Sequence, residues 1–212
     1  MPNAPFDYNL PYTTLNLREA PHLYHIGIGE QGVLLVEPYK SELLPLWRFR
    51  TPDIARESSQ SLQAKFEEYK KVGDFIGMDM ARKFIQMGVT RSRRYANHKG
   101  GRKYRKAKEG EVIMGKGKRA KEGKIELPRD TEDPVKAESA RIFGEVLKLV
   151  KDDKTYQELT KKHRDMYETG PGVEDSSTKQ ENGVKKRKVA QKAVFKQSNA
   201  KVPLRRSPRG KR

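Results

Sequence analysis

The chain contains no cysteine, and this absence excludes several kinds of site at once. Without thiols there is no disulfide framework, no thiolate nucleophile and no zinc site built on cysteine ligands. Long apolar runs are missing as well, because no stretch approaches the roughly 18 apolar residues that a membrane-spanning helix needs. The N-terminal segment MPNAPFDYNLPYTTLNL lacks the basic start and the apolar centre of a secretory signal. These absences predict a soluble intracellular protein.

Histidine is scarce, and its positions are dispersed along the chain. The four residues are His22, His25, His98 and His163. His22 and His25 are close in sequence, but no third metal-ligating residue accompanies them. We therefore expect no metal site and no cofactor.

Acidic residues are few in two parts of the chain, which makes the charge distribution uneven. Residues 91–124 carry 14 Lys and Arg against 3 acidic residues, and residues 174–212 carry 13 against 3. Since the formal net charge of the whole chain is +18, the remaining residues together are slightly acidic. A nearly neutral body with two cationic segments is typical of a protein that binds a polyanion, rather than of a generally basic enzyme.

The sequence divides into three parts. Residues 1–22 are rich in proline and predict an extended N-terminal arm, because proline keeps the residue before it out of the helical region. Residues 23–168 predict a globular domain, with a basic loop or partly disordered insert at 91–127. Residues 169–212 have too few apolar side chains to form a core, so we expect a disordered basic tail there.

The domain is predicted to be of the α+β class. Short β-branched or aromatic runs at 23–29, 32–39 and 46–50 favour a small antiparallel sheet near the N-terminus. Three or four helices are expected to pack on this sheet. The last of them is expected around residues 154–167.

Helix boundaries are marked by capping residues. Thr51 and Asp133 each precede a proline, a combination that starts a helix because the first helical position does not need its N–H. Asp74 is a third predicted N-cap. Gly73 and Gly88 are predicted to end the helices that precede them.

Three stretches carry a resemblance to a known family: GEQGVLLVEPYKSELLPLWRF (29–49), FIGMDMARKFIQMGVTRSRRYANHKGGRKY (75–104) and KAESARIF (136–143). They are similar to an uncharacterised family of small proteins found in bacteria, phages and fungi, catalogued as domain of unknown function 4385. The resemblance covers roughly residues 5–168 and leaves the tail outside. It implies no activity, cofactor or catalytic residue, so function has to be inferred from side-chain chemistry.

The stretch GVTRSRRYANHKGGRKYRK (88–106) is the main candidate binding site. Its glycine pair interrupts any single helical face, but a flexible loop can wrap a phosphate surface, and tyrosine rings can stack on bases. The predicted contacts with nucleic acid are Arg91, Arg93, Arg94, Tyr95, Lys99, Arg102, Lys103 and Tyr104. A small phosphorylated ligand held by HKGGRK (98–103) is an alternative, although this segment does not match the P-loop pattern.

Two basic elements stand out in the tail. The first resembles a monopartite nuclear import signal, which places the protein in the nucleus with an import receptor as a partner; it consists of Lys185, Lys186, Arg187 and Lys188. The second resembles elements of chromatin-associated tails that enter the minor groove or are phosphorylated; its residues are Arg205, Arg206, Ser207 and Arg209.

Together these features predict a non-enzymatic, largely sequence-independent nucleic-acid-binding protein of the nucleus, in which the tail adds avidity. The choice between DNA and RNA stays open. The alternative is an enzyme acting on nucleic acid or a nucleotide, with a metal-dependent nuclease-like site around Glu37, Lys40 and Asp79. A third interpretation is a protein-interaction module for an acidic partner. Binding that is steeply salt-dependent and needs no metal would distinguish the first of these from the second.

Overall fold

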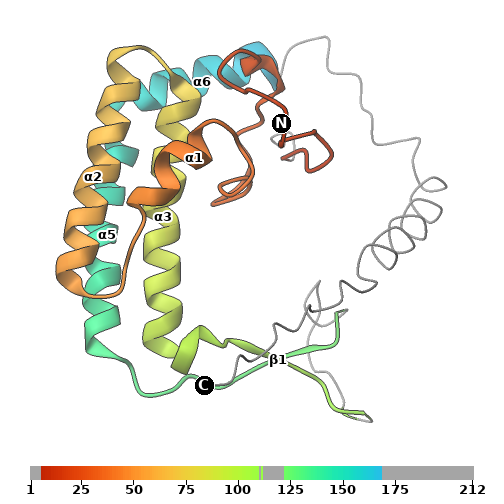
Figure 1. The fold of residues 1–212 in the computed structure, drawn as a ribbon, viewed down its shortest axis with the longest axis vertical. Helices are drawn as coiled ribbons and strands as arrows, with labels where there is room; N and C mark the ends of the chain where they lie inside the picture. Colours follow the sequence, from red (N-terminus) through yellow and green to blue (C-terminus); the bar gives the residue numbers. More distant parts are fainter. Residues whose placement is uncertain (1–5, 110, 112–121, 169–212) are drawn as a thin grey trace, which may run out of the picture. The chain divides into compact units, whose positions relative to one another are not determined.

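The computed structural model describes residues 6–109, 111 and 122–168, which form an α+β fold (Figure 1). The strands β1 (Tyr104–Lys106) and β2 (Lys124–Glu126) pair in an antiparallel two-stranded sheet. Short 3-10 turns occupy Pro21–Leu23 (η1), Leu44–Leu46 (η2) and Lys99–Gly101 (η3). The helices of the described residues are α1 (Tyr39–Leu43), α2 (Pro52–Lys71), α3 (Phe75–Asn97), α5 (Pro134–Asp152) and α6 (Lys154–Tyr167).

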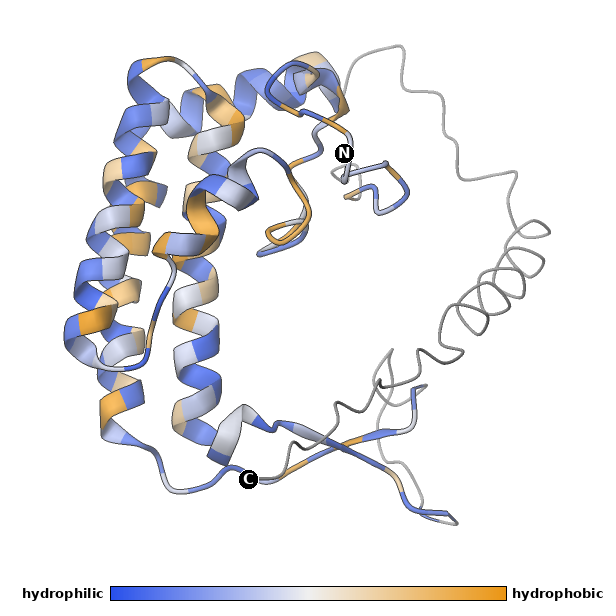
Figure 2. Ribbon diagram, viewed as in Figure 1, coloured by the Kyte–Doolittle hydropathy of each residue, from blue (hydrophilic) through white to orange (hydrophobic). Residues whose placement is uncertain are grey.

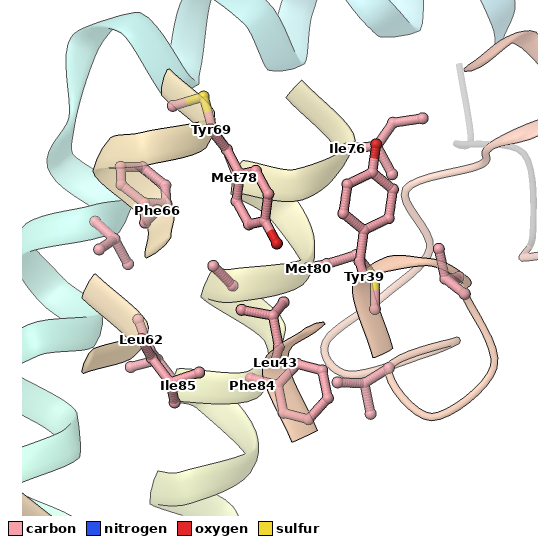
Figure 3. Packing of buried hydrophobic residues seen from close by; sticks show 14 of the residues in the cluster. Tyr39, Leu43, Leu62, Phe66, Tyr69, Ile76, Met78, Met80, Phe84 and Ile85 are labelled. Atoms are coloured by element: carbon pink, nitrogen blue, oxygen red, sulfur yellow. The ribbon is translucent and has the colours of Figure 1, made fainter. Parts of the chain in front are cut away.

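Three long helices, α2, α3 and α5, pack against one another and make up the body of the fold (Figure 1). Polar and apolar residues alternate along these helices, whereas the hairpin is mostly hydrophilic (Figure 2). Buried side chains of α1, α2 and α3, among them Leu43, Phe66 and Phe84, meet in the core (Figure 3). Met78, Met80 and Met87 are buried in this core, as their helical spacing predicts. None of the helices in the described residues is both long and apolar enough to cross a membrane.

The predicted helix starts are confirmed. Thr51 Oγ1 accepts the N–H of Ile54, and the carboxylate of Asp74 accepts the N–H of Gly77 at 2.9 Å. Asp133 caps α5 in the same way, with Pro134 at the first helical position. Each cap satisfies an N–H that the first turn of a helix leaves without a partner. Capping chemistry is local, which is why the sequence reveals it.

The sheet is not where the sequence predicts it. Residues 23–29, 32–39 and 46–50 form turns, short 3-10 segments and α1, and no strand. Gly27, Gly29 and Gly32 have φ angles of +66°, +65° and +80°, which strands do not adopt. The apolar residues of this segment are instead buried against the helices, so they need no strand partner.

Gly88 does not end its helix, contrary to the prediction. α3 continues to Asn97, and it therefore carries the first three cations of the predicted basic loop, Arg91, Arg93 and Arg94. A Cβ on Gly88 would lie 2.4 Å from the ring of Phe143 in α5. The glycine serves close packing of two helices, and it has ordinary helical geometry.

Several predictions fall outside the described residues. They concern the disordered tail (169–212), the import signal at 185–188 and the basic element around Ser207. They stay predictions. The described part of the N-terminal arm consists of bends, turns and the start of η1, and it buries Phe6, Tyr12 and Leu17.

Candidate nucleic-acid interface

A shallow groove of 270 Å³, here called the cationic groove, lies where the end of α3 meets the hairpin. Lysine and arginine dominate its wall, and within the described part of the chain no acidic side chain lines it. The lining residues are Arg94, Gly101, Arg102, Lys103, Tyr104, Arg105, Lys106 and Lys124. A concave surface of this composition attracts phosphate groups.

The turn after α3 directs the chain into the groove. His98 N–H donates to the carbonyl of Arg94 at 3.0 Å and closes the helix. Gly100 and Gly101 follow with φ angles of +66° and +67°, a region that side chains with a Cβ rarely adopt. At Gly101 a Cβ would also lie 2.5 Å from the ring of Tyr95. Only glycine allows this backbone to pack on the tyrosine.

Strand pairing brings cations from distant parts of the sequence together. The register sets Tyr104 opposite Glu126 and Lys106 opposite Lys124. The pairing extends beyond the strands, since Leu127 N–H donates to the carbonyl of Lys103 at 2.9 Å. Like charges directly opposite each other destabilise a strand pair. The register therefore brings the two positive residues Lys106 and Lys124 close together on the hairpin.

Three cations of the groove are paired with acids outside it, and three are not. The Nζ of Lys103 lies 3.1 Å from Oε1 of Glu126, and the Nζ of Lys124 lies 2.7 Å from Oε2 of Glu122. Arg105 binds Glu111 through both of its terminal nitrogens, and this hydrogen bonding lowers the pKa of Glu111 to about 2. In the part of the chain that the structure describes, no acid pairs with the remaining groove cations. These are Arg94, Arg102 and Lys106.

The structure gathers only part of the predicted contact set into the groove. Four predicted residues line it, namely Arg94, Arg102, Lys103 and Tyr104. Arg93 is exposed and pairs with Glu132 at 3.5 Å, and Arg91 and Lys99 lie outside the groove. Sequence reasoning left three lining cations out of that set, Arg105, Lys106 and Lys124. For Lys124 the sequence signal was the basic composition of 91–124, but its neighbours depend on strand pairing.

Tyr95 has a supporting role in the structure. Its ring lies 5.5 Å from that of Phe49, which in turn lies 5.0 Å from Trp47. Together with the contact to Gly101, this row of rings holds the turn after α3 against the helical body. Tyr95 keeps 39% of its surface exposed. It borders the groove and does not line it.

The residues of the predicted nuclease-like site have other partners. Glu37 forms a surface ion pair with Lys40 and accepts the hydroxyl of Ser41 at 2.8 Å. These contacts lower the pKa of Glu37 against the opposing effect of desolvation. Within the described residues, no group of three or more His, Cys, Asp and Glu side chains is placed to hold a metal ion.

Asp79 lies at the centre of a buried polar network. Its carboxylate accepts hydrogen bonds from Arg82 Nη2 at 2.7 Å and Tyr156 OH at 2.6 Å, and also from Tyr24 OH. The ammonium of Lys83, fully buried as well, lies 3.3 Å away. Burial alone would raise the pKa of Asp79, but the two cations and the tyrosines hold it well below its usual range. The carboxylate is thus ionised and engaged by the protein itself.

Lys83 fixes the glycine-rich segment before α1 to the bundle. Its ammonium donates to the carbonyls of Ile26 and Gln31, the second at 2.9 Å. Desolvation lowers the pKa of this lysine, while Asp79 opposes that effect. The network is therefore a structural connection between residues 24–31 and α3, formed from charges that burial would otherwise make costly.

His163 in α6 predicts a pH dependence of stability. Its Nε2 lies 2.7 Å from the carbonyl of Tyr24, so the ring donates there, and burial lowers its pKa. The unfolded chain therefore takes up a proton first, at a pH near the ordinary pKa of about 6.5. The free energy of unfolding should fall as pH drops from 7.5 to 5.5, by at most about 1.4 kcal/mol per pH unit for this group. Urea unfolding over this range measures it.

The matched variants are His163→Gln, which keeps a donor near Tyr24, and His22→Gln at an exposed position. The first variant should show a weaker pH dependence than the parent chain. The second should behave like the parent. An unchanged pH dependence in His163→Gln would contradict the assignment.

A larger cleft of 560 Å³ lies near the turn between α2 and α3. Its polar groups satisfy one another: Arg18 lies 3.0 Å from Glu42 and 3.1 Å from Asp74, and Tyr69 OH donates to Glu42 at 2.6 Å. Positive and negative groups are nearly balanced there. This cleft therefore attracts an anion less strongly than the cationic groove does.

The fold and the groove together define a small α+β protein with a cationic surface site. A family model described as domain of unknown function DUF4385 matches residues 7–166, and the chain belongs to this family. This confirms the resemblance seen in the sequence. The family is uncharacterised and has no assigned activity. No curated protein and no solved structure matches the chain.

Proposed function

We propose that the protein binds nucleic acid without catalysing a reaction, and that the cationic groove holds the phosphate backbone. The observation that carries this proposal is the lining of the groove: six lysines and arginines from α3, the glycine turn and both strands, with no acid among them. Phosphate contacts of this kind are largely independent of base sequence. The basic tail would add a second, tethered contact and so raise avidity.

The opposed pair Lys106 and Lys124 supports phosphate as the ligand. The register sets these two lysines directly opposite each other, which costs stability in the free state. Lys124 has an acidic partner in Glu122, whereas Lys106 has none among the described residues. A bound phosphate would remove that repulsion. Three cations without acidic partners are thus available for charge-assisted hydrogen bonds.

The test is a salt series. In the full chain, the triple variant Arg94→Gln, Arg102→Gln, Lys106→Gln should bind a fluorescein-labelled oligonucleotide about tenfold or more weakly at low salt. The slope of log K against log salt should become shallower by about 2 to 3, since each lost phosphate contact removes roughly 0.7 to 0.9 from it. Fluorescence anisotropy gives both quantities.

The control variant changes charge equally, elsewhere on the fold. Lys148→Gln, Lys151→Gln and Lys162→Gln lie at exposed positions of α5 and α6. Their salt slope should stay within about 1 of the parent slope. Equal effects of the two triple variants would mean that net charge, and not the groove, determines binding.

A further inference from the structure

A second groove, here called the mixed groove, has a volume of 450 Å³ and shares Arg102 with the cationic groove. Unlike its neighbour, it combines cationic, apolar and acidic groups. The lining residues are Lys99, Gly100, Arg102, Leu127, Pro128 and Asp130. Its composition differs from that of a phosphate site, and the difference suggests which part of a nucleic acid it receives.

The carboxylate of Asp130 is held in a fixed place. Its Oδ2 accepts the N–H of Lys99 at 2.7 Å, and its own N–H donates to the carbonyl of Asn97 at 2.9 Å. Asp130 is exposed, and in the described residues its second carboxylate oxygen accepts no hydrogen bond. A phosphate would be repelled by this group, whereas the N–H groups on the edge of a base would be accepted.

Leu127 and Pro128 provide an apolar wall beside that carboxylate. Leu127 is half-buried, and its N–H is fixed by the carbonyl of Lys103 at 2.9 Å, while Pro128 is exposed. Apolar side chains gain nothing from a phosphate, but they pack on the flat face of a base. The Arg102 guanidinium can stack on the same base or bind a phosphate next to it.

We infer that the protein takes single-stranded nucleic acid, with one unpaired base in the mixed groove and the adjoining phosphates in the cationic groove. Arg102 lies in both walls, so one strand can pass from one groove into the other. In a duplex the bases are paired and stacked inside the helix, so no base could enter the mixed groove. The duplex would place backbone phosphates, and not a base edge, next to the carboxylate of Asp130. The inference rests on the proposed function and specifies its substrate class.

The experiment compares three labelled probes of equal length with the full chain: a single strand of mixed sequence, its duplex, and a strand of abasic sugar–phosphate units. The single strand should bind at least about fivefold more tightly than the abasic strand, as expected for one base packed on the protein. Leu127→Ala should remove most of this difference. It should leave the affinity for the abasic strand unchanged.

Asp130→Asn is the second variant, and it retains an oxygen that can accept the N–H of Lys99. The preference for single strand over duplex should fall about threefold or more, because a neutral amide oxygen accepts base N–H groups less strongly and no longer repels phosphate. If Asp130 only holds the turn, the affinities for both probes rise together and their ratio stays constant. That result would contradict the inference. A thermal melt of each variant verifies that it is folded.

The outcomes separate the two proposals. If the abasic and normal strands bind alike, and both depend on Arg94, Arg102 and Lys106, the base site is wrong and phosphate binding stands. If duplex binds more tightly than single strand, the inference is likewise overturned. If no probe binds in a salt-dependent way, the proposed function fails, and the inference fails with it.

Discussion

Replacing Asp79 by alanine is expected to destabilise the protein by about 3–5 kcal/mol, the cost of leaving buried charges without their partner. Arg82 and Lys83 would then keep two cations in the interior with no anion between them. Tyr24 and Tyr156 would lose their hydrogen-bond acceptor as well. Urea unfolding followed by circular dichroism measures the change in the free energy of unfolding.

Glu37→Ala is the matched control, since the sequence presents both acids as candidates for one catalytic site. Glu37 pairs with Lys40 at the surface, so its removal should cost less than about 1 kcal/mol. Similar destabilisation by Asp79→Ala and Glu37→Ala would refute the buried network as a stabilising unit.

The second large effect is expected at Gly88 of α3, which packs against Phe143 of α5. A Cβ at this position would lie 2.4 Å from the ring of Phe143, which is itself fully buried. Gly88→Ala should therefore destabilise the protein by about 1–3 kcal/mol, although alanine favours a helix by about 1 kcal/mol. Thermal or urea unfolding gives the difference.

Gly144 in α5 provides the control for this prediction. It is also a glycine inside a helix, but a Cβ there would meet nothing within 4 Å. Gly144→Ala should stabilise the protein by about 0.5–1 kcal/mol, from helix propensity alone. The two substitutions are chemically identical, but their effects on the free energy of unfolding should have opposite signs. If both stabilise, the contact between Gly88 and Phe143 does not limit the packing.

Local chemistry explains what could be predicted. Thr51, Asp74 and Asp133 cap helices through atoms a few residues away, so these starts were visible in the sequence. Gly73 ends α2 with a φ angle of +69°, again as predicted. The position of the sheet could not be predicted in this way. Apolar residues in 23–50 only show that the segment is buried, and burial against helices satisfies them as well as strand pairing does.

The candidate site was only partly predictable. The cationic segment 91–124 was evident from composition, and four of the eight predicted contacts line the cationic groove. Arg94 lies in α3 because the helix continues past Gly88, which packs against Phe143 of α5. The place of Lys124 depends on strand register. Both are contacts between residues far apart in the chain, which neither composition nor periodicity encodes.

By itself, the sequence determined the starts of the long helices, the family and the concentration of positive charge in two segments. Those features depend on neighbouring residues or on simple counts. Only the tertiary structure decided that Asp79 is a buried partner of Lys83 and that Lys106 faces Lys124. Burial decides whether a carboxylate is a solvated surface group or a structural ion, and strand pairing decides which cations share one groove. Neither can be known until the chain has folded.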